Sequence, residues 1–319
     1  MPFPGSPVLD GLSASDGTSF ASVRRSLQPR YERAWVDLAA RWALLAGGYA
    51  AMCFAAARLG AHALYLVPPA ALWIGFWFAS IVLFMHEAAH FQLHPDKTAN
   101  DRLANLAICW LIGDEVGHYR VLHWQHHLHL GDPHDSEVSY HHAPSLRFGL
   151  ETLVGLHALR VFVNHRRARP EGEDRKRSDR RDVTALGRGL VAHGALLAVT
   201  LYAGLWPAAL SWLLAVAVVF PYFSALRQQL EHRSHGAASG IDYARIPHGA
   251  VNRMFRPTLF ARAMGAAGFR QHLLHHWDPS VSYTRFDDLE AFLMRTELAP
   301  LIEDTRTTYG AAWRSLARS

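Results

Sequence analysis

Histidine is the residue type in this sequence that offers the most chemistry. The chain of 319 residues contains 21 histidines, and about half of them lie in four short clusters. The first cluster is His86-Glu87-Ala88-Ala89-His90. In a helix, the i, i+4 spacing puts both imidazoles on one face, one turn apart. Because neutral imidazole is a common metal ligand, this spacing suits two ligands of one metal ion.

Three further clusters extend the pattern. HWQHH at residues 123–127 and HLLHH at residues 272–276 share the spacing HxxHH, and EHRSH at residues 231–235 lies between them. In HxxHH we expect the first two histidines to share a helix face, so that the third can reach a second metal. A lone histidine is usually a core or surface residue, and HxxxH arises by chance in a histidine-rich chain. Two copies of HxxHH are much rarer by chance, so we interpret the clusters together as a metal centre.

Two other classes of protein fit part of this pattern. HEAAH matches HExxH, the zinc-protease signature in which the glutamate is the general base. A protease needs only one further ligand, which leaves both HxxHH clusters unexplained. Intramembrane proteases of the site-2 type also use a Leu-Asp-Gly that follows HExxH. In this chain Leu-Asp-Gly occurs at residues 9–11, before HExxH. A metal transporter would hold its ligands inside membrane spans, whereas these clusters lie at the ends of apolar stretches and beyond them.

Long uncharged stretches must position the clusters. Residues 189–226 include no Asp, Glu, Lys or Arg, and residues 42–85 include only Arg58. A spanning helix needs about 20 apolar residues, so each stretch accommodates two spans, with breaks at 60–62 and 204–207. Buried helices of a large soluble protein are the alternative, but they rarely stay uncharged on every face. We predict spans at about 36–58, 63–85, 187–204 and 208–227.

Basic residues predict the orientation of these spans. Arginines precede each predicted hairpin, whereas the turns within the hairpins carry only Arg58. By the positive-inside rule, both termini and the middle segment are cytoplasmic, together with all four histidine clusters. The preceding basic residues are Arg24, Arg25, Arg30 and Arg33, then Arg166, Arg167, Arg169, Arg175, Lys176, Arg177, Arg180 and Arg181. Acidic residues alternate with the second run, which indicates a solvated loop and no nucleic-acid binding.

Composition excludes several other classes. With 50% hydrophobic and 18% charged residues, the chain is not disordered. Cys53 and Cys109 are its only cysteines and form no CxxC, which excludes a disulfide scaffold, a zinc ribbon and an iron–sulfur cluster. Residues 103–113 are apolar but too short to span, so we expect a buried or interfacial helix there.

The predicted fold class is an all-α integral membrane protein. About four transmembrane helices form two hairpins, and a cytoplasmic helical cap holds the histidine-rich site. The expected organisation is a polar cytoplasmic N-terminal segment (1–35), a membrane domain (36–290) and a cytoplasmic C-terminal tail (291–319).

HEAAH, HWQHH and HLLHH, in this order and with these hairpins, resemble the membrane fatty-acid desaturase superfamily over roughly residues 35–290. The tract LGDPHDSE after the second box is similar to bacterial desaturase-like proteins. The resemblance implies a non-haem di-iron centre that activates O₂ to break unactivated C–H bonds. It implies as ligands His86, His90, His123, His126, His127, His232, His272, His275 and His276. Glu231-His232 resembles the isolated Glu-His that follows the last hairpin in members of the superfamily, so the resemblance implies His232 as the ninth ligand. His235 or His94 could replace a ligand of the set.

Groups near the ligands in sequence are expected to fix the imidazole tautomers. These candidates are Glu87, Asp132, Asp135, Glu137 and Glu231. We interpret His94 and His129 as supporting or structural residues, and His193, inside a span, as a structural residue or part of the substrate route. His118, His134, His141 and His142 receive no predicted role.

The resemblance specifies the reaction less closely than the metal. We expect an O₂-dependent desaturase that introduces a C=C bond into a fatty-acyl or similar amphiphilic substrate. Hydroxylation, ketolation and oxidative decarboxylation by the same type of centre are the alternatives, with the intramembrane zinc protease as a remote one. Because the sequence shows no cytochrome b5, ferredoxin or dinucleotide motif, the electrons must come from an external ferredoxin, rubredoxin or cytochrome with its reductase. The arginine-rich 160–188 segment is a candidate docking site for such an acidic carrier. The expected location is a bacterial inner membrane.

Overall fold

The computed structural model describes residues 9–167 and 173–318, and its regular structure is almost entirely helical. The first half contains α1 (Phe20–Ser26), α2 (Tyr31–Leu59), η1 (Gly60–Leu66), α3 (Val67–Val82), α4 (Phe84–Ala89), α5 (Lys97–Ala107), η2 (Cys109–Ile112), α6 (Val116–His129), η3 (Ser139–His141), α7 (Leu146–Leu153) and α8 (Leu156–Arg167). The second half contains α9 (Glu173–Tyr202), α10 (Trp206–Leu214), η4 (Ala215–Val219), α11 (Phe220–His232), β1 (Met254–Phe255), α12 (Leu259–Met264), α13 (His272–Trp277), η5 (Tyr283–Arg285), α14 (Phe286–Leu293), α15 (Ala299–Thr305), β2 (Arg306–Thr307) and α16 (Tyr309–Leu316).

Three helical stretches of the described chain are long and apolar enough to cross a membrane. They are Tyr31–Ala89, Val183–Tyr202 and Trp206–His232. The first stretch is one helical run, but the 3₁₀ turn η1 divides it into α2 and α3, which pack against each other. Both expected breaks are confirmed: α2 ends at Leu59 before Gly60 (φ 54°), and Gly204 (φ 73°) separates α9 from α10. Glycine adopts such positive φ values without a Cβ clash.

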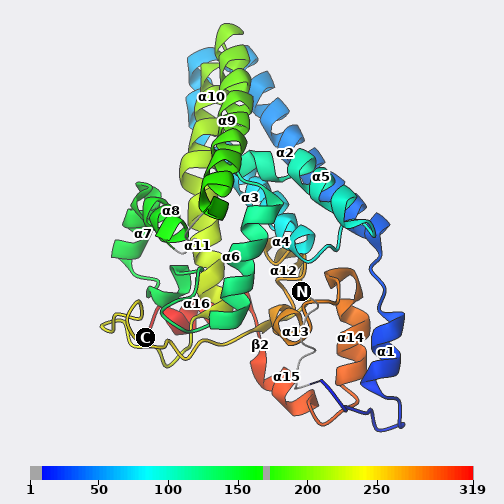
Figure 1. Ribbon diagram of the computed structural model, residues 1–319. Coiled ribbons are helices and arrows are strands. Elements are labelled where there is room, and N and C mark those ends of the chain that lie inside the picture. The colour runs from blue at the N-terminus through cyan, green and yellow to red at the C-terminus, as the bar shows by residue number, and fades with distance from the viewer. Residues whose placement is uncertain (1–8, 168–172, 319) are drawn as a thin grey trace.

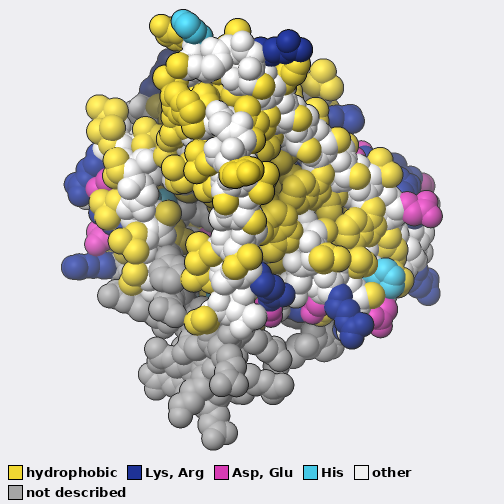
Figure 2. All heavy atoms as spheres, turned by 90° about the horizontal axis from the view of Figure 1, so that it is seen from above, with side chains coloured by type: hydrophobic (Ala, Val, Ile, Leu, Met, Phe, Trp, Pro, Cys, Tyr) yellow, Lys and Arg dark blue, Asp and Glu magenta, His cyan; other side chains and the backbone are white. Residues whose placement is uncertain are grey.

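Close packing joins the apolar helices into a bundle. Gly75 on α3 faces Val219 in η4 so closely that an added Cβ would lie 2.5 Å from the Val219 Cβ. Because only glycine fits there, α3 and the α10–η4–α11 helix approach at backbone distance, as is typical of membrane helices. On the outer surface Val191, Val199 and Tyr202 of α9 are more than two-thirds exposed. Figure 2 shows the molecule from above, at the end where α9 and α10 meet. Hydrophobic side chains dominate this face, and most charged side chains lie near its edge.

The remaining helices gather at the other end of the bundle. In Figure 1, α2, α9 and α10 rise above a lower region that contains α6, α12, α13 and α14. A second hydrophobic core there joins Leu9, Leu12 and Phe20 from the start of the chain to Phe286 and Phe292 from α14. The parallel pair β1–β2 aligns Met254 with Arg306. The N-terminal segment and α14 therefore share one core with Leu273 and Leu274 of the histidine-bearing α13.

The described helices agree with the predicted all-α class. The apolar segment 103–113 becomes the end of α5 followed by η2, with Cys109 fully buried. The side chains of the arginine-rich run 166–181 lie outside the described part of the chain, so orientation and carrier docking at this run remain predictions from sequence.

Candidate metal centre

Four helices bring the clustered histidines together. His86 lies on α4 and His90 follows its last turn, His232 is the last residue of α11, and two longer sets come from α6 and α13. The set on α6 is His123, His126 and His127, and the set on α13 is His272, His275 and His276. All nine residues named from the sequence meet here in two groups, and the candidate ligand atoms of each group lie within 4.8 Å of one another.

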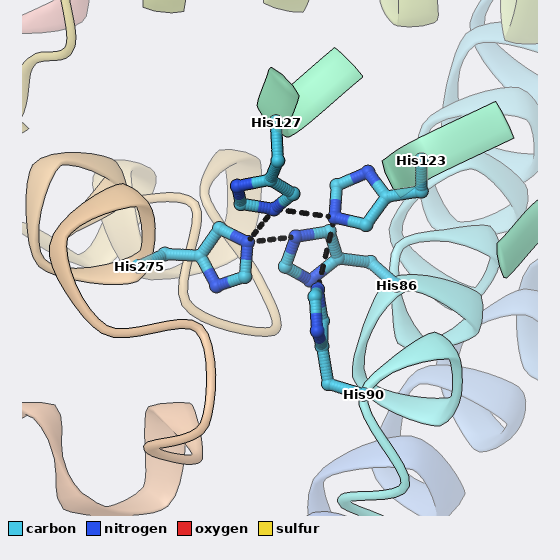
Figure 3. A group of neighbouring side chains, drawn as sticks. All are labelled: His86, His90, His123, His127 and His275. Atoms are coloured by element: carbon cyan, nitrogen blue, oxygen red, sulfur yellow. Dashed lines mark hydrogen bonds between the residues drawn. The ribbon is translucent and has the colours of Figure 1, made fainter. Parts of the chain in front are cut away.

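The first group consists of His86, His90, His123, His127 and His275 (Figure 3). Their Nε2 atoms point toward one another from three helices. The Nε2 of His275 lies 2.9 Å from that of His86 and 2.8 Å from that of His127. The Nε2 of His123 lies 2.9 Å from that of His90 and 3.0 Å from that of His127. Five ring nitrogens thus converge on one small volume.

The second group consists of His126, His232, His272 and His276. The Nε2 of His272 lies 2.9 Å from that of His232 and 3.2 Å from that of His276. The Nε2 of His126 is buried and has no hydrogen-bond partner among the described residues. Ring contacts between His127 and His276, with centroids 4.5 Å apart, join the two groups.

The division of each HxxHH differs from the expectation. His123 and His127 belong to the first group and His126 to the second, whereas His272 and His276 belong to the second. At about 100° per residue, i and i+4 are about 40° apart around the helix and i and i+3 about 60°. The first and third histidines therefore share a face, and the middle one reaches the other group.

Two of the imidazoles are held in the tautomer that a metal ligand requires, which shows that these histidines are suited to metal ions. His126 donates its Nδ1–H to Asp135 at 2.9 Å, and His232 donates its Nδ1–H to the Val251 carbonyl at 3.3 Å. In a neutral imidazole the other nitrogen then carries a lone pair, and both Nε2 atoms face into the second group. Imidazole ligands suit iron and related transition metals. Two adjacent sites with five and four such donors are therefore suited to two metal ions.

Electrostatics keeps most of these rings neutral. Burial, reinforced by neighbouring imidazoles, holds the pKa of His272, His275 and His276 well below the ordinary value. Burial also lowers the pKa of His126, but the carboxylates of Glu137 and Asp135 outweigh it and raise that pKa to about 9. These carboxylates thus favour a positive charge at the His126 ring, which a proton on Nε2 or a metal cation in its place supplies.

Carboxylates named from the sequence occupy different positions. Asp135 also accepts the Tyr140 hydroxyl at 2.5 Å. The Glu87 carboxylate accepts from the Ser282 hydroxyl at 3.0 Å, and a Glu137 oxygen lies 3.9 Å from the His123 Nδ1. Among the described residues, two other candidates make no hydrogen bond or ion pair with the nine rings. Asp132 accepts from His134 at the surface, and Glu231 pairs with Arg227.

Sequence reasoning missed several neighbours of the centre. The Phe269 ring lies against His86 and His272, with centroid distances of 4.5 and 4.9 Å, and the Arg227 guanidinium lies 4.0 Å from its centroid. Tyr119 stacks on His123 at 5.5 Å. These side chains carry no motif, and the spacing of α6 is the one signal that places Tyr119, four residues before His123, on its face.

The other histidines lie elsewhere. His235 contacts Arg253 and Ser315, and His94 contacts the backbone of Asp96. His193 accepts from Trp212 Nε1 at 3.2 Å and lies 2.9 Å from the Leu111 carbonyl, which fits the structural reading of this residue. The ring centroids of His129 and His134 lie 6.2 Å apart, outside both groups.

A cavity of about 390 Å³ adjoins the first group. His123, Tyr119 and the charged residues Asp114, Glu137 and Arg227 form part of its wall. Apolar side chains from the α3–α4 segment, α6, α8 and α11 form most of the rest. Its volume lies within the usual range of small-molecule sites, roughly 300–1,000 Å³. These apolar side chains include Val82, Leu83, Met85, Leu122, Val161, Phe220 and Ala225.

Together, the fold and the site define a helical membrane protein with a histidine-rich candidate metal centre. The family model described as fatty acid desaturase matches residues 63–305. The match begins after α2 and covers α3, α9, α10, α11 and all nine histidines, which is well over half of the chain. The chain therefore belongs to the fatty acid desaturase family, as the sequence motifs predicted. No curated protein matches the sequence significantly.

Proposed function

We propose that the two histidine groups hold two iron ions, and that the protein is an O₂-dependent oxidoreductase acting on an aliphatic chain. The observation that carries the proposal is the convergence of nine buried or half-buried imidazoles from four segments into two adjacent groups. The family match and the transition-metal preference of imidazole support iron as the metal. When bound, two irons supply activation of O₂ and removal of hydrogen from an unactivated C–H bond.

The residues around the groups orient the rings and limit access of water. Asp135 and the Val251 carbonyl fix the tautomers of His126 and His232. Tyr119 and Phe269 pack against the rings of the first group and shield them. Such a dry, rigid surround keeps the imidazole nitrogens available and protects a reactive centre from side reactions with solvent.

The cavity beside His123 is the proposed place for the reacting part of the substrate. The apolar part of its wall suits a hydrocarbon segment, and Asp114, Glu137 and Arg227 add charged groups to the same wall. His123 brings the first group to its edge. We therefore favour desaturation of a fatty-acyl or similar amphiphilic substrate. Hydroxylation, ketolation and oxidative decarboxylation use the same first hydrogen removal and are the alternatives. Electrons come from an external ferredoxin, rubredoxin or cytochrome.

The position of Glu87 disfavours the zinc-protease reading. The carboxylate contacts Ser282 and lies 3.8 Å from Nδ1 of His86, whereas the Nε2 atoms converge on the opposite edge of the ring. A general base must reach the reacting water, and this carboxylate lies behind the ligand. Glu87→Gln should therefore keep metal and measurable oxidative activity. Activity that persists without O₂ and a reductant would contradict the oxidoreductase proposal.

A histidine substitution with a matched control tests the metal assignment. His272→Ala removes a ring at the centre of the second group, whereas His134→Ala removes an exposed ring that contacts Asp132. We expect His272→Ala to lose iron and product formation, measured by metal analysis and by mass spectrometry of lipid products with a donor present. His134→Ala should retain both. Full iron content in His272→Ala would refute the assignment.

The proposed topology has four spans, with α2 and α3 forming one hairpin and α9 and α10–α11 the other. Both termini and the metal centre then face the cytoplasm. Ala61 lies in η1 at the turn between α2 and α3, and Ser239 is exposed in the loop that follows α11 and His232. In a chain with Cys53 and Cys109 replaced, an impermeant thiol reagent applied outside the cell should label Ala61→Cys and not Ser239→Cys. The reverse pattern would overturn this orientation.

A further inference from the structure

A small cavity lined by arginines lies apart from the metal centre. It has a volume of about 130 Å³ and forms where α2, the loop after α12 and the start of α14 meet. Four arginines and two aspartates line it, which leaves two positive charges unmatched. These residues are Arg33, Arg41, Arg262, Arg270, Asp37 and Asp287.

The aspartates neutralise only part of this charge. Arg270 donates to Asp287 at 2.8 Å, and the Nε of Arg33 lies 4.0 Å from a carboxylate oxygen of Asp37. Arg262 makes no ion pair or hydrogen bond through its guanidinium among the described residues. A guanidinium stays charged at any physiological pH, so the cavity keeps its positive potential.

The hydrogen bonds of the Arg41 side chain go to uncharged groups, although the Asp37 carboxylate lies near enough to interact with its charge. It donates through Nε to the Ser80 hydroxyl at 3.0 Å and through a terminal nitrogen to the Asp37 carbonyl at 2.6 Å. Carbonyl and hydroxyl oxygens position a guanidinium without cancelling its charge. Arg41 is therefore a fixed cation in the wall of the cavity.

On the four-span topology proposed above, the cavity lies near the membrane surface, at the start of the uncharged part of α2. Arg41 is the last charged residue before the nearly uncharged stretch 42–85, and Ser80 lies two residues before the end of α3. Basic pockets between membrane helices at this level bind the phosphates of anionic lipids. Gly268 lines the cavity, and the next residue in the chain, Phe269, packs on His86. The cavity and the metal centre therefore lie on opposite sides of this segment.

We propose that this cavity binds the phosphate of an anionic ligand, with Arg41 and Arg262 as its main contacts. Arginine presents paired N–H donors that match a phosphate. The ligand is the phosphodiester of an anionic membrane lipid or a water-soluble phosphate ester. This site is independent of the reaction proposed above, because none of its arginines contacts a histidine of either group.

Calorimetric titration of the full-length protein in detergent tests the proposal. The probes are short-chain phosphatidylglycerol, phosphatidylcholine of equal chain length, and inorganic phosphate. We expect phosphatidylglycerol to bind at one site per chain and more tightly than phosphatidylcholine, and salt to weaken its binding. If inorganic phosphate binds and competes with phosphatidylglycerol, the ligand is a soluble phosphate ester. If neither binds in preference to phosphatidylcholine, the proposal is overturned.

Charge variants locate the site. Arg262→Gln should weaken phosphatidylglycerol binding about tenfold, the usual order for one charge-assisted contact. Asp287→Asn removes an opposing charge and should tighten binding. Arg256→Gln changes an exposed arginine outside the cavity and should have no effect. Equal weakening by Arg256→Gln and Arg262→Gln would show diffuse attraction and refute a defined pocket. Unchanged melting temperature and iron content of the variants confirm their folding.

Discussion

Replacing Asp135 by asparagine should loosen the second histidine group while leaving the fold intact. The Asp135 carboxylate accepts four hydrogen bonds: two from the His126 Nδ1–H, at 2.9 and 3.0 Å, one from the Tyr140 hydroxyl at 2.5 Å and one from the Glu137 amide at 2.8 Å. Asparagine has one acceptor oxygen and an NH₂ group in place of the second. In either rotamer, the NH₂ group faces a donor of Tyr140 or Glu137, and the charge that holds His126 is lost.

The expected loss follows from the role of His126 in the second group. Without a carboxylate, the Nδ1–H of His126 is held less firmly, and the tautomer that presents Nε2 to the group is less favoured. Removing such an orienting partner lowers metal affinity about 10–100-fold, which corresponds to about 1.4–2.8 kcal/mol. We expect Asp135→Asn to release iron at a 10–100-fold lower chelator concentration than the unchanged protein, with a parallel fall in product formation.

Asp132→Asn is the matched control for this measurement. Asp132 lies three residues earlier, is 43% exposed, and accepts from the His134 Nδ1 at 2.7 Å. Surface substitutions usually change stability by less than about 0.5 kcal/mol, so its iron release should match that of the unchanged protein. Equal iron release by the two variants would refute the orienting role of Asp135.

Two further predictions concern stability. Gly75→Ala drives a Cβ into Val219 and should lower the free energy of unfolding by about 1–3 kcal/mol through overpacking, and with it the melting temperature. Gly47→Ala, with open space around it, should leave the melting temperature unchanged. Equal melting temperatures of the two variants would contradict the close approach of α3 and η4. Burial lowers the pKa of His157 to about 4. In the unfolded chain His157 binds a proton near pH 6.5, whereas in the folded chain it does so only near pH 4. The free energy of unfolding should therefore fall as the pH decreases from about 6.5 to 4. His157→Gln, which keeps a partner for Ser139, should reduce this pH dependence, and an unchanged melting profile between pH 7 and 4.5 would refute it.

Hydropathy and histidine spacing together predicted most of the elements that build the site. The uncharged stretches located α2, α3, α9 and the α10–α11 helix because a membrane-facing surface allows few charges on any side. The boxes located the rings because metal ligands on one helix must share a face. We expected His126 to share the face of His123 and His127 to reach the other group, but the structure shows the reverse. Residue i+4 lies about 40° from residue i around a helix and residue i+3 about 60°, so the choice depends on a difference of only about 20°.

Contacts between distant segments could not be predicted from local patterns. Val251 orients His232 through a backbone carbonyl, which every residue possesses, so no side-chain signal marks it. Phe269 and Arg227 meet at the rings only after α11 and the loop before α13 have packed. The hydrophobic core that joins Leu9 and Phe20 to α14 is likewise a pairing of segments far apart in the sequence, which neither composition nor periodicity specifies.

The distribution of the nine histidines along the chain has a consequence for biosynthesis. Both groups draw on α13, which contributes His275 to the first group and His272 to the second. During synthesis, the first group therefore has four of its five imidazoles once residue 127 has emerged, while the second has only His126. A nascent chain thus presents a partial site well before the complete pair of sites exists. Divalent metals compete for such sites according to their availability. If the groups load during synthesis, we expect the metal supply between the emergence of residues 127 and 276 to influence which ion is enclosed when α13 docks.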